Sequence, residues 1–352
     1  MLESISNGPA AGAAIIPAVY ALTALVAGAG RAPATAWAAA RTGTLAALVL
    51  AIFVAISGAI IHAGSFSHVV APGLDMPFFW LRADAVTVTM LLMVTFIAAV
   101  ITSYSRRYLD GDADQVGYVR WLMATLCAVA VLIVTNSLLM LALAWIATSL
   151  ALHNLLTHFA DRPQAIIAAH KKFLVSRLAD VFLLAAVACV GAAFGTLELD
   201  ALASALRGPL PDSPLPMIAA VLFALTAIIK CAQLPFHGWL IQVMEAPTPV
   251  SALLHAGVVN IGGIVMIRLA PLMSQVELAQ LLLVIAGTTT VLLAGLVMTT
   301  RVSIKVNLAW STSAQMGFML VQCGLGAYSL ALLHIVAHSL YKAHAFLASG
   351  GA

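Results

Sequence analysis

The stretch that decides the fold runs from Lys230 to Arg268 and reads KCAQLPFHGWLIQVMEAPTPVSALLHAGVVNIGGIVMIR. Pro235 interrupts its first apolar part, and because proline lacks a backbone N–H, it should break or kink a helix there. Lys230, His237 and His255 lie within or beside apolar runs long enough to cross a bilayer. Broken helices and charged side chains at membrane depth usually line a site, so the stretch predicts an intramembrane functional site.

The composition of the whole chain gives the class of protein that surrounds this stretch. Of 352 residues, 63% are hydrophobic and 8% are charged, whereas soluble globular domains have about 45–50% and about 25%. The formal net charge of +3 is too small for a nucleic-acid-binding face on a chain of this length. We therefore expect an all-α polytopic membrane protein in contact with membrane lipids and with no nucleic acid partner.

A membrane span needs about 20 mostly apolar residues, and the chain contains about eleven such segments. We expect them at roughly 9–30, 42–63, 84–103, 117–135, 137–157, 173–194, 215–243, 247–269, 278–300, 304–325 and 329–348. The seventh segment is too long for one simple span and contains Pro235. A broken seventh helix is therefore predicted.

Lysine and arginine are distributed unequally between the loops of this arrangement. Those that follow odd-numbered spans are Arg31, Arg41, Arg106, Arg107, Arg120, Arg162, Lys171, Lys172, Arg301 and Lys305. Those that follow even-numbered spans are Arg82, Arg207 and Arg268. The positive-inside rule then predicts a multi-pass membrane protein with its N-terminus outside.

The last predicted span carries a polar stripe. His334, His338 and Lys342 are spaced four apart, which places all three on one face of a helix. Histidine titrates near neutral pH, so neighbouring groups of this kind can pass a proton through bridging water. A lone intramembrane histidine is as often a structural residue, but together with Lys230 and His255 the stripe favours a proton path.

Arg177 and Asp180 are spaced three apart near the start of the sixth span and can pair on one helix face. Both an ion pair that anchors a helix end and a role in transport are compatible with this spacing.

His334 and His338 also have the spacing of a helical zinc site, but Ile335 stands where a metalloprotease needs its glutamate. No phosphate-binding loop, dinucleotide fingerprint or nucleophile elbow is present, so we expect no metal, cofactor or catalytic residue in this chain.

The stretch from Lys230 to Arg268 resembles the antiporter-like membrane subunits of respiratory complex I (subunit L type) and of the Mrp cation/proton antiporters. The resemblance extends to FLVSRLADVFLL, SIKVNLAWSTSAQMGFM and HIVAHSLYKAHAFLASG, and covers about residues 80–350. It implies two inverted five-helix repeats, each with a broken helix: N-terminal spans at 1–115, a first repeat at 116–272 and a partial second repeat at 273–352.

The same resemblance implies roles for individual residues. Lys230 would be the broken-helix lysine, His255 the histidine beside it and Lys305 an inner bridging lysine. The central relay would be His334, His338 and Lys342. The residues expected in supporting positions are Arg177, Asp180, His237 and Glu245.

The sequence departs from the family pattern in two places. The fifth span of the family usually carries a glutamate that pairs with the broken-helix lysine, but here Ile146 occupies that position. The charge partner of Lys230 is therefore missing or supplied from elsewhere. In addition, the chain ends before the later broken helix and its exit lysine, so the second repeat is expected to be incomplete.

With Ile146, the sequence from Lys230 to Arg268 looks more like the membrane subunit of the DAB inorganic-carbon accumulation complex. That resemblance implies a large, mostly soluble partner of the DabA type, with a zinc site like that of β-type carbonic anhydrases. The chain would then use a proton or sodium gradient to drive one-way hydration of CO₂ to bicarbonate. The alternative is a proton-pumping subunit of NADH-quinone oxidoreductase or of an Mrp antiporter. A purely structural scaffold would explain the hydrophobicity but not the polar stripe.

Overall fold

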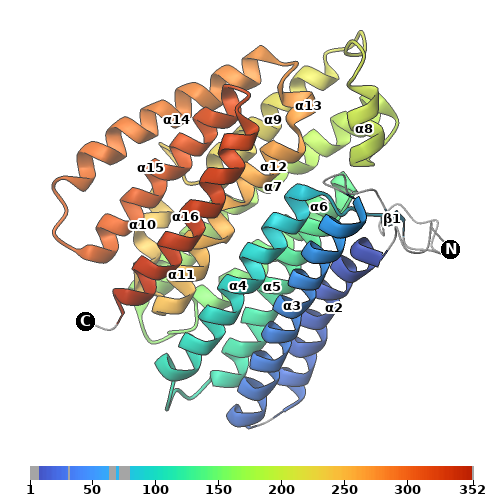
Figure 1. Cartoon of the computed structure of the whole chain (residues 1–352). Coiled ribbons are helices and arrows are strands. Elements are labelled where there is room, and N and C mark those ends of the chain that lie inside the picture. Colours follow the sequence, from blue (N-terminus) through green and yellow to red (C-terminus); the bar gives the residue numbers. More distant parts are fainter. Residues whose placement is uncertain (1–7, 31, 63–68, 71–79, 351–352) are drawn as a thin grey trace. The chain divides into compact units, whose positions relative to one another are not determined.

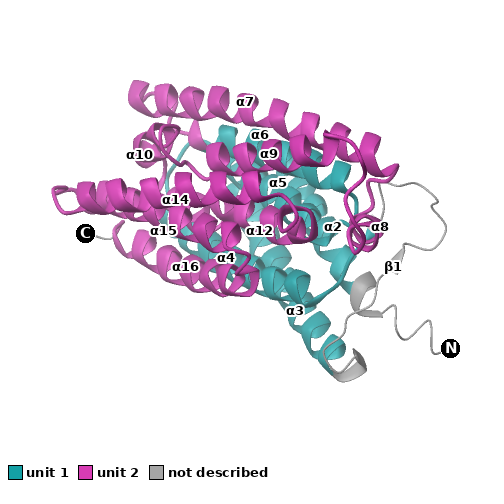
Figure 2. Cartoon of the chain, turned by 90° about the horizontal axis from the view of Figure 1, so that it is seen from above, with its two compact units in different colours: residues 1–155 teal, residues 156–352 magenta. Residues whose placement is uncertain are grey.

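The structure, a computed structural model, describes residues 8–30, 32–62, 69–70 and 80–350. By its internal contacts the chain divides into unit 1, Met1–Leu155, and unit 2, Leu156–Ala352 (Figure 2). This division rests on contacts within each unit and does not test for structural repeats. The repeat boundaries expected after residues 115 and 272 therefore stay a prediction.

Unit 1 is built mainly of long helices (Figure 1). Its elements are α2 (Gly8–Ala29), α3 (Pro33–His62), β1 (Val69–Val70), β2 (Trp80–Leu81), α4 (Ala85–Tyr108), α5 (Gln115–Val134) and α6 (Leu138–Leu156). Helix α2 packs against α3 and α5, and α3 packs against α4. The two short strands pair antiparallel.

Unit 2 contains long helices together with several short helical pieces (Figure 1). Its first elements are α7 (Pro163–Phe194), α8 (Leu199–Ala205), α9 (Leu215–Lys230), α10 (Gly238–Gln242), η2 (Val243–Glu245) and α11 (Thr248–Ala256). They are followed by η3 (Val258–Asn260), α12 (Ile261–Arg268), α13 (Ala270–Met273), α14 (Glu277–Met298), α15 (Ile304–Gly324) and α16 (Tyr328–Ala348). Helix α7 packs against α9, α14 against α15, and α11 against α16.

Within the described residues, nine helices or helix pairs are long and apolar enough to cross a membrane. Helix α9, with 16 residues, is shorter, and α15 has 21 residues with Lys305 in its first turn. Each of the eleven predicted segments contains at least part of one of these helices. The prediction of an all-α polytopic membrane protein is therefore confirmed.

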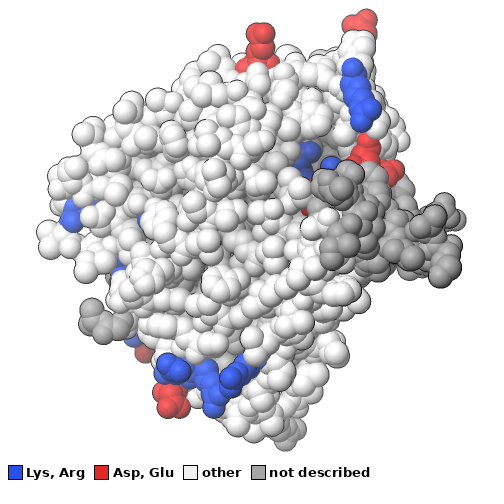
Figure 3. All heavy atoms as spheres, viewed as in Figure 1, with Lys and Arg blue, Asp and Glu red and all other residues white. Residues whose placement is uncertain are grey.

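The surface of the helices suits a lipid environment. Most of the face seen in Figure 3 is uncharged, and the charged atoms gather mainly near its edges. Side chains such as Leu25, Leu292 and Leu296 are exposed. Hydroxyl groups in the helices are satisfied locally: Thr95 Oγ1 donates to Leu91 O at 2.8 Å. Such bonds back to the preceding turn let threonine lie within an apolar span.

The seventh predicted span is broken, as expected. Helix α9 ends at Lys230, residues 231–237 are not helical, and α10 begins at Gly238. The eighth predicted span is broken too, which the sequence did not predict. There α11 ends at Ala256, and a short 3₁₀ segment separates it from α12. No proline marks this second break; Gly257 ends α11 with φ −127° and ψ −71°.

Two predicted helix starts were wrong. Helix α3 begins at Pro33 rather than at residue 42, and α7 begins at Pro163 rather than at residue 173. In both cases a proline occupies the first turn, where its missing N–H costs nothing and its fixed φ suits a helix. Arg41 and Lys172, expected in loops, therefore lie on helices. Arg31 lies outside the described residues.

Helices α14 and α15 run side by side at close range (Figure 1). A Cβ atom added to Gly287 would lie 2.5 Å from Gly317 O, and one added to Gly317 would lie 2.7 Å from Gly287 O. The two backbones therefore touch directly at these glycines. Small residues commonly allow such close approach between membrane helices.

Candidate functional site

A buried carboxylate in unit 2 binds two cations. Asp180 on α7 lies 2.6 Å from Lys230 Nζ through Oδ1 and 2.7 Å from Arg177 Nη2 through Oδ2. Lys172, 4% exposed, interacts electrostatically with the other three residues. We call these four residues the Asp180 cluster. Because Ile146 replaces the family glutamate, the charge partner of Lys230 was left open; in the structure, Asp180 of α7 is that partner.

The packing of α7 against α9 positions this pair. Thr226 Oγ1 on α9 lies 3.4 Å from Ala179 O on α7, one turn before Lys230 and one residue before Asp180. Lys230 is the last residue of α9, where the partial negative charge of the helix C-terminus favours a cation. The ammonium group is therefore held by a carboxylate and by the end of its own helix.

Polar contacts hold the non-helical segment that follows Lys230. Ser313 Oγ on α15 donates to Ala232 O at 2.9 Å, and Leu234 N donates to Thr290 Oγ1 on α14 at 3.1 Å. Gln233 Nε2 donates to Cys231 O at 2.8 Å. Buried backbone groups released from a helix need such partners. Pro235 lies in this segment, within the break that it was expected to cause.

A second group of polar side chains lies where α11 packs against α16. His255, His338 and Lys342, which we call the central cluster, are each no more than 1% exposed. His255 interacts electrostatically with both other members. Lys342 Nζ donates to Leu308 O at 3.0 Å, and the His255 ring stacks on Phe346 with centroids 4.4 Å apart.

Both ring nitrogens of His255 and of His338 are buried, and they make no hydrogen bond to the described part of the chain. Buried polar groups of this kind are the usual sites of internal water. His334 lies beside the central cluster, with its ring centroid 6.0 Å from that of His338. The two histidines line a cavity of about 290 Å³ between α15 and α16.

The break in the eighth predicted span is hydrogen-bonded to α16, the helix that carries His338 and Lys342. Asn260 Nδ2 donates to Ser339 Oγ on α16 at 2.7 Å and to Ala256 O at 3.0 Å. Ser339 follows His338 directly. The amide of Asn260 thus links the end of α11 to the part of α16 that carries the central cluster.

Besides Pro235 and His334, three of the predicted residues lie outside the two clusters. Lys305 Nζ donates to Thr248 Oγ1 at the start of α11 at 3.1 Å. His237 is half-buried beside Trp310, with ring centroids 5.0 Å apart. Glu245 is exposed on η2. The structure therefore gives these three no direct contact with Lys230 or His255 among the contacts described.

Lys172 and Asn260 are the site residues that sequence reasoning missed. Lys172 was counted among loop residues because the start of α7 was placed ten residues too late; a helix from Pro163 would have shown it two turns before Asp180. Asn260 lay in a span read as continuous, and its neighbours carry no helix-breaking proline. The expected absence of a metal and of a cofactor stays a prediction.

Two family models match the chain. The model described as NADH:quinone oxidoreductase/Mrp antiporter, TM matches residues 135–352. The model described as NADH-Ubiquinone oxidoreductase (complex I), chain 5 N-terminus matches residues 74–120. The first match spans more than half of the chain and contains the Asp180 cluster and the central cluster.

Curated relatives include subunits of two kinds of assembly. The probable inorganic carbon transporter subunit DabB of Hydrogenovibrio crunogenus is 50% identical over 77% of this chain and 52% of its own length. The corresponding DabB2 of Halothiobacillus neapolitanus is 47% identical over 79% and 50%. NADH-quinone oxidoreductase subunit L of Mycobacterium tuberculosis is 33% identical over 82% and 46%. The chain spans about half the length of the curated relatives it matches.

Solved structures share the fold. A chain of the archaeal membrane-bound sulfane sulfur reductase matches with a TM-score of 0.84 and 19% identity, over 96% of this chain and 70% of that one. A chain of the Mrp complex from Dietzia matches with a TM-score of 0.80 and 26% identity, over 96% and 37%. The chain belongs to the NADH:quinone oxidoreductase/Mrp antiporter membrane family, as an antiporter-like subunit related to DabB and to complex I subunit L.

Proposed function

We propose that this chain is the cation-translocating membrane subunit of an energy-coupled inorganic carbon pump. The proposal rests on the ion pair between Lys230 and Asp180, together with Ile146 at the position of the family glutamate. Two relatives with 50% and 47% identity are named as probable inorganic carbon transporter subunits. The translocated ion is a proton or Na⁺.

The Asp180 cluster acts as an ion-controlled switch in this proposal. When a proton or Na⁺ reaches Asp180, the carboxylate is neutralised and its attraction for Lys230 weakens. Because a buried charge is strongly disfavoured without a partner, Lys230 must then move or release its own proton. Arg177 remains beside the carboxylate and favours return to the paired state. Binding of an ion at Asp180 is thus coupled to the position or protonation of Lys230.

The central cluster continues the path. Water held at the buried nitrogens of His255 and His338 would connect them to Lys342, since each group exchanges protons and the three are electrostatically coupled. His334, which lines the cavity beside His338, is proposed as a further member of this relay. Lys305, hydrogen-bonded to the start of α11, is proposed as the bridging residue; His237 and Glu245 are proposed as supporting residues at its margins.

The ion gradient would drive a partner subunit. The proposed partner is a large, zinc-containing, carbonic-anhydrase-like subunit of the DabA type, which hydrates CO₂ to bicarbonate in one direction. No zinc is proposed for the present chain. We place the chain in the bacterial cell inner membrane with its N-terminus outside, because lysine and arginine then lie mainly on the cytoplasmic side.

The test is to express the tagged gene in its native membrane, isolate the complex and determine its subunits and zinc content. One large zinc-bearing partner is expected. Co-expression of the two genes should rescue growth of a CO₂-dependent host, and Lys230→Ala in the membrane subunit should abolish that rescue. Isolation without a zinc-binding partner, together with absence of rescue, would contradict the proposal.

The second candidate is a proton-pumping subunit of complex I or of an Mrp antiporter. It is favoured by the 33% identity to subunit L of Mycobacterium tuberculosis and by the likeness to the Mrp structure. The same isolation distinguishes the two candidates. Co-purification of flavin-linked and iron–sulfur-linked subunits, or of further antiporter subunits, would support this candidate instead.

A further inference from the structure

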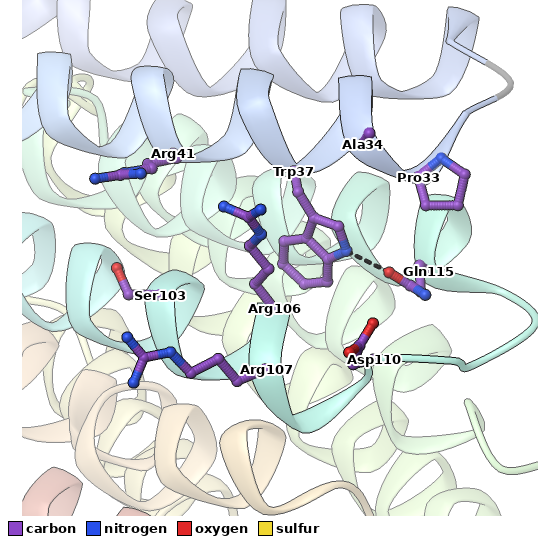
Figure 4. A pocket seen from close by; sticks show the side chains of 9 residues that line it. All are labelled: Pro33, Ala34, Trp37, Arg41, Ser103, Arg106, Arg107, Asp110 and Gln115. Atoms are coloured by element: carbon purple, nitrogen blue, oxygen red, sulfur yellow. Dashed lines mark hydrogen bonds between the residues drawn. The ribbon is translucent and has the colours of Figure 1, made fainter.

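A cavity of about 590 Å³ lies in unit 1 between the start of α3 and the end of α4 (Figure 4). Three arginines line it: Arg41 from α3, and Arg106 and Arg107 from the last turn of α4. In Figure 4 the guanidinium of Arg106 points toward α3, between Trp37 and Arg41, while Arg107 extends past Ser103. None of the proposed ion-translocation residues belongs to this cavity.

The charge of the cavity is strongly unbalanced. None of the three arginines forms an ion pair with a carboxylate in the described part of the chain. Asp110 is the acidic residue among the lining residues, which leaves a net charge of +2. Figure 3 shows a group of basic side chains, with acidic atoms beside it, at the lower edge of the molecule. The cavity is therefore suited to an anion.

One wall of the cavity is fixed by a buried aromatic side chain. Trp37 is 4% exposed, and its Nε1 donates to Gln115 Oε1 on α5 at 2.6 Å (Figure 4). Its ring also lies against Tyr118, with centroids 6.0 Å apart. Tryptophan with a satisfied N–H is typical of the level at which a bilayer meets water.

Apolar stripes lead from the cavity along both helices. With spacings of three and four residues, one face of α3 carries Arg41, Leu45, Val49, Ile52 and Ile56, and one face of α4 carries Arg107, Ser103, Val100 and Phe96. All nine side chains are exposed. From Arg41 to Ile56 the stripe rises about 22 Å, enough to accompany an acyl chain through one leaflet. Because α3 and α4 are antiparallel neighbours, both stripes end in arginine at the same end.

We propose that this cavity binds the phosphodiester of an anionic phospholipid, whose acyl chains lie along the exposed stripes of α3 and α4. The planar guanidinium groups of Arg41, Arg106 and Arg107 can each bind phosphate oxygens through two N–H groups. Free phosphate would use the arginines but not the stripes. Continuity of the charged cavity with two exposed apolar stripes is what selects a lipid.

Native mass spectrometry tests the proposal on the full chain. The protein is reconstituted in nanodiscs of phosphatidylethanolamine and phosphatidylglycerol, extracted in mild detergent and weighed with its retained lipids. We expect wild type to retain phosphatidylglycerol in preference to phosphatidylethanolamine. In the triple variant Arg41→Gln, Arg106→Gln, Arg107→Gln, retention should fall by roughly a hundredfold, since each arginine near a bilayer surface contributes about fivefold.

A matched variant controls for loss of charge alone. Arg120→Gln, Arg162→Gln, Arg301→Gln removes the same number of arginines from the same predicted side, outside the cavity, and should retain the lipid. A second arm adds inorganic phosphate or glycerol 1-phosphate to the delipidated protein. Equal retention by the two triple variants, no headgroup preference in wild type, or displacement of the lipid by millimolar inorganic phosphate would each overturn the proposal.

Discussion

At the scale of single residues, Asp180 is notable because its two carboxylate oxygens serve different helices. Oδ2 binds Arg177 from its own helix, and Oδ1 binds Lys230 from α9. The two interactions differ in cost when removed. If Lys230 is removed, the carboxylate keeps Arg177, whereas removal of the carboxylate takes from Lys230 the counterion that lies 2.6 Å from its Nζ.

We therefore expect Asp180→Asn and Lys230→Ala both to abolish ion transport but to differ in stability. Asp180→Asn should lower the free energy of unfolding by about 3–5 kcal/mol, because a buried cation loses its counterion. Lys230→Ala should leave expression nearly unchanged. Ion flux into proteoliposomes and thermal unfolding in detergent measure the two effects. Asp180→Glu, which keeps the charge, should restore part of the transport, and full transport by Asp180→Asn would refute a role for the pair.

The histidines of α16 offer a second comparison at this scale. His338 is 1% exposed in the central cluster, whereas His344 is exposed on the same helix. His338→Ala should abolish transport because it removes a proton-exchanging group from the central cluster. His344→Ala should transport normally. Proton uptake by vesicles under an imposed gradient measures both, and equal rates in the two variants would show that His338 is not on the path.

The sequence revealed most of these residues, and the spacing of Arg177 and Asp180 predicted their ion pair, but not the contacts between different helices. Lys230, His255, His338 and Lys342 stand out because charged or titratable side chains are rare in apolar spans. The pairing of Asp180 with Lys230 depends on how α7 and α9 pack, and no spacing along the chain reports a contact between residues 50 positions apart. Lys172 was missed because the adjacent lysines 171 and 172 are typical of the edge of a loop.

At the scale of elements, the direct contact of α14 and α15 fixes the helices that hold the broken segment. Thr290 of α14 and Ser313 of α15 bind the backbone at Leu234 and Ala232. Any change in the separation of these two helices would change the positions of both hydroxyl groups. The sequence predicted both helices and the break after Lys230 but could not predict this contact, because glycine is common throughout membrane helices.

Gly287→Ala should accordingly lower the free energy of unfolding by about 1–3 kcal/mol, since the added Cβ would overlap Gly317 O. Gly295→Ala, on the same helix, is the matched control. A Cβ there meets nothing within 4 Å, so that variant should be unchanged or stabilised by about 0.5–1 kcal/mol. Thermal unfolding of the purified proteins distinguishes the two. If both variants unfold at the wild-type temperature, the helices do not touch at Gly287.

At the scale of the whole molecule, the organisation of the chain in the membrane follows from its charge distribution. The apolar surface of both units and the nine membrane-length helices within the described residues make the chain a multi-pass membrane protein. Composition and hydropathy were sufficient to predict this, because the bilayer restricts spanning structures to helices and closed barrels. The side on which each loop lies rests on the positive-inside rule alone.

Cysteine labelling tests that orientation. Ala113→Cys, in the exposed loop between α4 and α5, should react with membrane-impermeant maleimide only in inside-out vesicles. Ser213→Cys, in the exposed loop between α8 and α9, should react in intact cells from which the outer membrane has been removed. Both are made in a background without Cys127, Cys189, Cys231 and Cys323. The reverse labelling pattern would place the N-terminus inside.

Gly317 has a consequence for sequence variation among homologues. On one side it faces Gly287 O, and on the other a Cβ added to it would lie 3.0 Å from Gln233 Oε1 in the broken segment. A side chain at residue 317 would therefore disturb both the packing of α14 against α15 and the amide of Gln233. Natural sequences should keep glycine at this position, and a homologue that carries a larger residue should also differ at the positions equivalent to 233 and 287. Such covariation across three segments would reveal a contact that cannot be recognised from one sequence alone.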